Sequence, residues 1–191
     1  MIGMINVLKY YASFAFLTIA GLVSFPQVSD AQVVDPAVSD FAVLTKEYAN
    51  DLEKIERSLI PLPKQATPAQ VAAHRETFLK AVQRSRSGLK QGSIFTPEIS
   101  AYLKKLMAVE LDVAERAELR KEVIEAENKA VVVRVNYPYP PTQEILEVPA
   151  TLLQVLPQLP KQLKYRFVGR NMLLVDRESS LIVDFIANAI P

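Results

Sequence analysis

The chain has 191 residues, half of them hydrophobic, and its 22 basic and 21 acidic side chains nearly cancel. This length accommodates one domain, or a helical region with a small second one, and the balanced charge argues against nucleic acid as a partner. The absence of cysteine excludes disulfides, thiol catalysis, iron–sulfur ligation and lipoprotein acylation.

Residues 1–31 have the pattern of a secretory signal. A basic residue precedes the uncharged stretch of residues 10–29, and Ser29 and Ala31 place small side chains where a signal peptidase requires them. We therefore expect a mature protein that begins at Gln32 and is periplasmic or otherwise exported. An uncleaved membrane anchor is the alternative, because the uncharged stretch has about the roughly 20 residues that a membrane span needs.

The first helix is predicted to begin at Pro36. Asp35 can cap its first amides, and a proline at the first helical position loses no hydrogen bond. Apolar residues then recur at steps of three or four, which places them on one helical face. They are Val38, Phe41, Leu44, Tyr48, Leu52, Ile55 and Leu59. Pro61 and Pro63 end this helix.

Two further helices are predicted to begin at Thr-Pro pairs. Thr67 and Gln70 form a capping box before a helix that runs to about Ser87. Its apolar stripe consists of Val71, Phe78 and Val82, followed by Leu89. Thr96-Pro97 repeats the opening for a third helix, whose apolar residues are Ile99, Leu103, Leu106 and Val113. A charged tail continues to residue 129, and the pattern leaves open whether the helix breaks near Asp112.

The middle of the helical region is basic. Residues 64–105 carry eight basic and two acidic side chains, whereas acidic residues predominate in segments 32–63 and 106–129. This partition favours antiparallel helices with complementary faces, although each exposed ion pair contributes under about 1 kcal/mol. The alternative is a strip that docks an acidic partner. It would consist of Arg75, Lys80, Arg84, Arg86 and Lys90.

Segment 130–191 is predicted to be a small β-rich module with a proline-rich connector. The run at 130–136 is typical of a strand, and YPYPP at 137–141 is typical of extended, polyproline-like chain that cannot continue a sheet. A short helix beginning at Pro149 would carry Leu152, Leu153 and Leu156, and Pro157 and Pro160 would stop it. These two prolines also match PxxP, a pattern that docks in aromatic grooves, but a stiff connector is the favoured interpretation.

The remaining residues predict a sheet. Residues 163–167 alternate apolar and basic, residues 169–171 have turn chemistry, and residues 172–176 form the return strand. Residues 181–186 are apolar enough for a third strand, which Asp184 interrupts. The predicted fold class is α+β: three to four antiparallel helices over residues 32–129, followed by an antiparallel sheet of three to four strands with one face against the helices.

No catalytic, cofactor-binding or metal-binding set is predicted. His74 is the only histidine and is interpreted as a partly buried, hydrogen-bonded residue of the second helix, since zinc or a catalytic triad needs further partners. Ser87 and Lys90 match the SxxK pattern of some serine hydrolases, without its companion motifs. Four carboxylates on one helix face could hold a hard cation, but the basic residues among them favour a solvated face. They are Glu115, Glu118, Glu122 and Glu125.

The string KYRFVGRNMLLVDRESSLIVDFI looks like the tails of many small exported bacterial proteins that are uncharacterised. Over Tyr165–Phe185 it also resembles the hairpin of the periplasmic RcnB-like family. The resemblance implies a periplasmic hairpin module and a link to envelope or metal homeostasis. Because the chain lacks tryptophan and has one histidine, no functional residue is carried over from that family.

The expected function is that of an exported, non-enzymatic interaction or scaffold protein with a protein partner in the cell envelope. The connector and the hairpin would form the contact surface, because tyrosine and arginine dominate interface energetics. The candidate contact residues are Tyr137, Tyr139, Arg166 and Arg170. Two alternatives are a membrane-anchored subunit of an envelope assembly, which retains residues 1–31, and a small serine hydrolase that uses Ser87 and Lys90.

Overall fold

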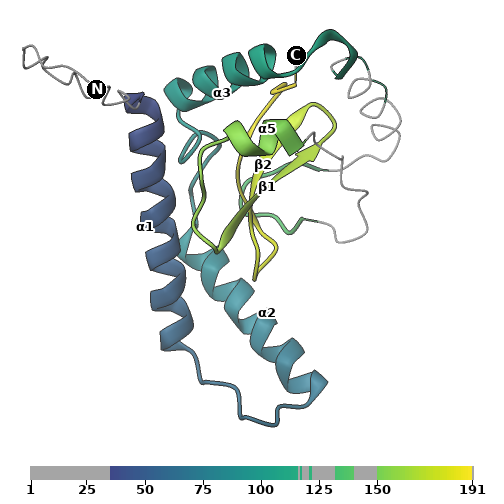
Figure 1. Ribbon diagram of the computed structural model, residues 1–191. Coiled ribbons are helices and arrows are strands. Elements are labelled where there is room, and N and C mark those ends of the chain that lie inside the picture. Colours follow the sequence, from purple (N-terminus) through teal and green to yellow (C-terminus); the bar gives the residue numbers. More distant parts are fainter. Residues whose placement is uncertain (1–34, 116, 118–120, 122–131, 140–149, 191) are drawn as a thin grey trace, which may run out of the picture. The chain divides into compact units, whose positions relative to one another are not determined.

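The computed structural model of the chain describes residues 35–115, 117, 121, 132–139 and 150–190. The expected signal or anchor, residues 1–31, lies outside this part. In the part of the chain that is described, no helix is long and apolar enough to cross a membrane. Helices precede a three-stranded antiparallel sheet (Figure 1), so the α+β fold class is confirmed.

The first two helices begin with the capping hydrogen bonds that the sequence predicts. The helices are α1 (Pro36–Ser58), α2 (Pro68–Ser85), α3 (Pro97–Glu110) and the short α5 (Ala150–Val155). Asp35 accepts a hydrogen bond from the Ala37 amide at 2.9 Å. The predicted capping box of α2 is present in both directions, at 3.3 Å to the Thr67 hydroxyl and 2.8 Å to the Gln70 side chain. Caps of this kind satisfy amides that lack a partner within the helix.

Two details of the helices differ from expectation. The apolar stripe of α2 is buried only at Phe78 and Val82, whereas Val71 in its first turn and Leu89 beyond its end are exposed. Thr96 precedes α3 as predicted, but its side chain makes no capping hydrogen bond. Pro97 alone therefore marks that start, through its fixed φ angle.

A new helical turn begins at Asp112, which decides the question that the sequence left open. Leu111 has an extended backbone, with φ −83° and ψ 122°, and ends α3. The Asp112 carboxylate accepts from the Glu115 amide at 2.8 Å, and the Glu115 carboxylate accepts from the Asp112 amide at 2.9 Å. Val113, which was expected to continue the stripe of α3, is exposed.

The sheet follows the predicted hairpin. Its strands are β1 (Leu163–Val168), β2 (Asn171–Asp176) and β3 (Ile182–Ile186), in the order β1-β2-β3. Gly169 adopts φ +53° as the first of the two residues that join β1 to β2, a conformation that glycine permits at low cost.

The predicted strand at 130–136 is wrong for the residues that the structure describes. Residues 132–134 have no regular structure, and residues 135–136 form a turn; residues 130 and 131 lie outside the described part. Asn136 has φ +65°, and its side chain donates to the carbonyl of Gln83 on α2 at 2.9 Å. The backbone of Asn136 is left-handed and its side chain is hydrogen-bonded to α2. The chain therefore turns at Asn136 and does not continue as a strand.

The proline-rich stretch, by contrast, pairs with β3. The Tyr139 amide donates to the Ser180 carbonyl at 2.7 Å, and the Ile182 amide donates to the Tyr137 carbonyl at 2.9 Å. Pro138 lies between these bonds, bridged to Leu181 in a pair that exchanges no hydrogen bond. Its missing N–H therefore costs nothing here, and the expectation that YPYPP cannot continue a sheet is wrong at this residue.

The helices and the sheet share one hydrophobic core. The helix-facing side of the sheet packs against α1, α2 and α3, and the buried residues at this contact include Phe41, Phe78, Leu103, Met107, Phe167 and Leu174. The rings of Phe41 and Phe95 stack with their centroids 5.5 Å apart. On the opposite face of the sheet, Tyr139 packs over a smaller cluster that consists of Leu173, Val175 and Ile182.

A β-bulge in β3 places Asp184 inside the protein. Leu174 pairs with Asp184 and Val175 pairs with Ile182, so Val183 is the extra residue. The Asp184 carboxylate is fully buried and accepts from the amides of the loop before α3. The donors are Gly92 at 3.0 Å, Ile94 at 2.8 Å, Phe95 at 2.9 Å and its own neighbour Phe185 at 2.8 Å. The residue that seemed to interrupt the strand thus fastens it to the helical region.

Arg86 binds the same bulge from the end of α2. The side chain is 7% exposed, and its Nη2 atom donates to the carbonyl of the extra residue Val183 at 2.8 Å. Its guanidinium also lies over the ring of Tyr48, 4.9 Å from the centroid. Arg86 is therefore not part of an exposed docking strip. Of the other strip residues, Arg75 pairs with Glu178 at 3.6 Å and Lys80 pairs with Glu76 at 2.6 Å.

Replacing Asp184 with alanine is expected to lower the free energy of unfolding by about 3 kcal/mol or more. Several buried loop amides would lose their acceptor, and each unsatisfied buried group costs about 1–3 kcal/mol. Urea denaturation followed by circular dichroism measures the change. Asp51→Ala is the matched control, because Asp51 is exposed and its pair with Lys54 contributes under about 1 kcal/mol. Equal stability of the two variants would contradict the anchoring role of Asp184.

Candidate functional site

Asp176 and Tyr48 form a second buried polar contact. The Tyr48 hydroxyl donates to Asp176 Oδ2 at 2.9 Å, and Asp176 Oδ1 accepts from the amides of Glu178 and Ser179 at 2.8 and 3.2 Å. Burial raises the pKa of Tyr48 well above its usual range, and the Asp176 charge raises it further. Burial lowers the pKa of the neighbouring Arg86. A raised pKa favours the neutral hydroxyl, which donates the hydrogen bond to Asp176.

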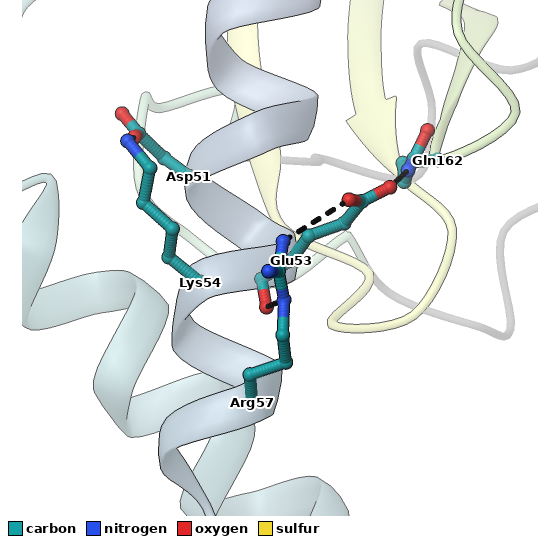
Figure 2. A network of polar contacts seen from close by, with 5 residues as sticks. All are labelled: Asp51, Glu53, Lys54, Arg57 and Gln162. Atoms are coloured by element: carbon teal, nitrogen blue, oxygen red, sulfur yellow. Dashed lines mark hydrogen bonds and ion pairs between the residues drawn. The ribbon is translucent and has the colours of Figure 1, made fainter.

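A cleft of about 480 Å³ lies beside this contact, between α1 and the residues that flank β1 and β2. Figure 2 shows Glu53 at its α1 wall, held between two neighbours. Gln162 Nε2 donates to Glu53 Oε1 at 3.1 Å, and Arg57 Nη2 lies 3.4 Å from Glu53 Oε2. The contact with Gln162 ties the chain just before β1 to α1. Both Glu53 oxygens are engaged, which favours a structural role for this residue.

The candidate chemical groups of the sequence are not brought together. His74 is half-buried as expected, although its ring makes no hydrogen bond within the described residues. Ser87 and Lys90 are exposed around Gly88, whose φ of +86° interrupts the helical spacing that would align a Ser-x-x-Lys pair. Among the described residues, no group of three or more His, Asp or Glu side chains is arranged to hold a metal ion. Glu118, Glu122 and Glu125 lie outside them.

The four predicted contact residues occupy different environments. Tyr137 is 46% exposed and stacks with Arg134, whose guanidinium lies 5.0 Å from the ring centroid. Tyr139 is 7% exposed, so its ring belongs to the sheet's second cluster. Arg170 is exposed, but its carbonyl accepts from Ala189 and Ile190 at the hairpin turn. Arg166 is half-buried on β1.

At the outer edge of β1, the Tyr165 carbonyl accepts from Arg166 Nη1 at 3.2 Å, whereas two backbone amides have no acceptor among the described residues. Arg177 N donates to Gln162 O at 2.8 Å, so the hydrogen-bonded pairs of the hairpin fall on the even-numbered residues of β1. The amides of Leu163, Tyr165 and Phe167 therefore point away from β2. Leu163 N donates to Pro160 O, whereas the amides of Tyr165 and Phe167 have no acceptor among the described residues. We call these two groups the edge amides.

A groove of about 560 Å³ runs along this edge. Its walls come from α5 (Leu153 and Leu156), from the connector at residues 157–161, and from residues 163–166 of β1. Consecutive strand residues point to opposite faces of a sheet, so a hollow lined by all four must lie beside the strand's edge. The Tyr165 hydroxyl donates to the Pro157 carbonyl at 2.8 Å and fixes the connector wall. We call this hollow the β1 groove.

Among the described residues that line the β1 groove, four are cations and none is a carboxylate. They are Lys161, Lys164, Arg166 and Arg177. None of the four forms an ion pair with an acidic side chain in the described part of the chain. The pKa of Lys164 is lowered, chiefly by burial and further by the charges of Arg166 and Arg177. The charge of Asp176 opposes this lowering of the Lys164 pKa.

Sequence reasoning found one of these residues and missed the others. Arg166 was a candidate contact residue, and the alternation of apolar and basic residues in β1 was recognised. The order of the strands decides which strand has an open edge, and no local pattern reveals this order. Of the three leucines predicted on the short helix, Leu152 and Leu156 are buried and Leu153 is 52% exposed.

Stability is expected to fall as the pH rises above about 10, the ordinary pKa of tyrosine. Unfolded chains lose the Tyr48 proton there while the folded state keeps it, so the folded state binds more protons and unfolding becomes easier. In the Tyr48→Phe variant, the free energy of unfolding should decline less steeply, by up to about 1.4 kcal/mol per pH unit. Urea unfolding between about pH 8 and pH 11 measures it. Tyr137→Phe, at an exposed site, is the control, and identical slopes for both variants would contradict the prediction.

No family model, curated protein or solved structure matches this chain. The resemblance of Tyr165–Phe185 to the RcnB-like hairpin therefore stays a prediction from the sequence.

Proposed function

We propose that this protein is an exported, non-enzymatic interaction module that holds a protein partner of the cell envelope at the β1 groove. The observation that carries the proposal is the coincidence of three features at one place. Within the described residues, two backbone donors without acceptors, a groove with apolar residues in its walls, and four cations without acidic partners all lie along the outer edge of β1.

Each feature supports protein binding for a separate physical reason. An unpaired strand edge is a template for another chain, and folded proteins ordinarily cover or blunt it. The exposed side chain of Leu153 on the apolar wall offers area that is removed from water on binding. The cations steer an oppositely charged partner to the groove and select against partners of like charge.

The proposal retains part of the contact surface expected from the sequence and revises the rest. Residues 157–161 of the connector and residues 163–166 of the hairpin line the β1 groove, and Arg166 lies within it. Tyr139 instead supports the sheet from its opposite face. A membrane-anchored subunit would differ only in retaining residues 1–31 and would bind through the same groove.

A photo-crosslinking amino acid at position 153 is expected to form discrete adducts with an envelope protein in intact cells. Leu153 is exposed at the rim of the groove, so a crosslinker there reaches a bound partner. The matched control is position 109, where Val109 is equally apolar and 71% exposed on α3. Adducts at position 153 should weaken when Lys164 and Arg166 are replaced by glutamate. Equal adducts at both positions, or none at either, would refute the proposal.

Export is tested separately, by the intact mass of the protein isolated from the envelope fraction. A mass that matches Gln32–Pro191 is expected, because Ser29 and Ala31 form the predicted cleavage site. The full-length mass in a detergent-dependent fraction would instead support the anchored subunit.

A further inference from the structure

We propose that the β1 groove takes an extended acidic segment of the partner, which adds to the edge of β1 as a further strand. This inference rests on the proposed function and names the chemistry of the partner. Its argument has three steps, which concern the backbone, the two sides of the groove and the charge.

The backbone of β1 requires an extended ligand. The two edge amides, of Tyr165 and Phe167, lie two residues apart and point to the same side. That spacing matches the repeat of hydrogen-bonding groups along one edge of a β-strand, and a helix, whose amides are used internally, does not provide it. The sheet therefore selects a segment in which every second residue presents its backbone to β1.

The two sides of the groove require different side chains. Tyr165 points to the helix-facing side of the sheet, where Leu153, Leu156 and the connector form an apolar wall. Lys164 and Arg166 pair with Val175 and Leu173 and so point to the opposite side. Successive residues of an added strand also alternate between these sides. The preferred segment therefore alternates apolar residues, which contact α5, with acidic residues, which meet the two cations.

Charge decides against a second copy of this chain as the occupant. Two copies joined through their β1 edges would bring Lys164 and Arg166 of one copy close to the same residues of the other. Like charges on adjacent strands are destabilising. Cations on an edge strand also discourage such pairing in general, and that protective role alone is the competing explanation for these two residues. A purely protective role of Lys164 and Arg166 would not require the groove or its apolar wall.

The first test uses a capped synthetic peptide of about eight residues that alternates glutamate and valine, kept below the concentration at which it self-associates. We expect saturable binding by isothermal titration calorimetry, and no binding of the matched lysine–valine peptide. Lys164→Gln combined with Arg166→Gln should weaken binding by roughly tenfold. Lys104→Gln, on the exposed surface of α3, should leave it unchanged. Circular dichroism establishes that each variant is folded.

The second test separates strand addition from simple charge attraction. In an extended peptide the valine amides point to one edge and the glutamate amides to the other. N-methylation of the valine amides and N-methylation of the glutamate amides should therefore have opposite effects, with one peptide losing binding and the other keeping it. Amide hydrogen exchange should show new protection at Tyr165 and Phe167, with no change at Lys164 and Arg166, whose amides already bond to β2.

The outcomes distinguish this inference from the function on which it rests. Equal binding of both N-methylated peptides, or no new protection of the edge amides, would overturn strand addition. If no peptide binds and the Lys164→Gln, Arg166→Gln variant self-associates, the cations serve only to protect the edge. Crosslinks from position 153 would then still support a protein partner that is not an extended segment. Peptide binding without any crosslink would refute the envelope partner and leave strand addition standing.

Discussion

The buried carboxylate of Asp184 is the contact on which the arrangement of helices and sheet depends. It lies on β3 and accepts the amides of Gly92, Ile94 and Phe95, which precede α3. These amides belong to the loop before α3, so the Asp184 carboxylate satisfies buried loop groups and holds the chain that leads into that helix. The bulge that turns Asp184 inward also exposes the Val183 carbonyl to Arg86. One irregularity in one strand thus positions the ends of two helices.

The open edge of β1 follows from how the rest of the sheet is covered. The helices occupy one face of the sheet. Tyr139, which belongs to the segment that pairs with β3, packs over the other face. The walls of the β1 groove are nevertheless fixed, by the bond from Tyr165 to Pro157 at one place and by the bond from Gln162 to Glu53 at another. Walls that are ordered before binding reduce the conformational entropy that a partner must overcome. The groove therefore combines unsatisfied backbone with an organised surface.

Features that depend on neighbouring residues could be read from the sequence, and features that depend on distant partners could not. The cap at Asp35, the capping box at Thr67 and the turn at Gly169 each involve residues within a few positions. Arg86, by contrast, looked like part of an exposed basic strip, because the carbonyl that binds it lies 97 residues away. Asp184 was predicted to interrupt a strand, because the loop amides that bind its carboxylate are also distant in the sequence. The groove was missed because it depends on strand order, although its charges were visible in β1.

Because of Pro138, the two edges of the sheet differ in their ability to pair with a strand of another molecule. The backbone groups of Tyr137 and Tyr139 form hydrogen bonds with β3. The backbone of Pro138, between them, faces away from β3, and this residue has no N–H. A fibril of stacked sheets needs a donor-bearing edge on both sides of every subunit. In the part of the chain that the structure describes, such an edge is found at β1, where two cations repel a neighbour of the same kind. Pairing of copies through these two edges of the described sheet is therefore disfavoured at one side by the missing N–H of Pro138 and at the other by charge.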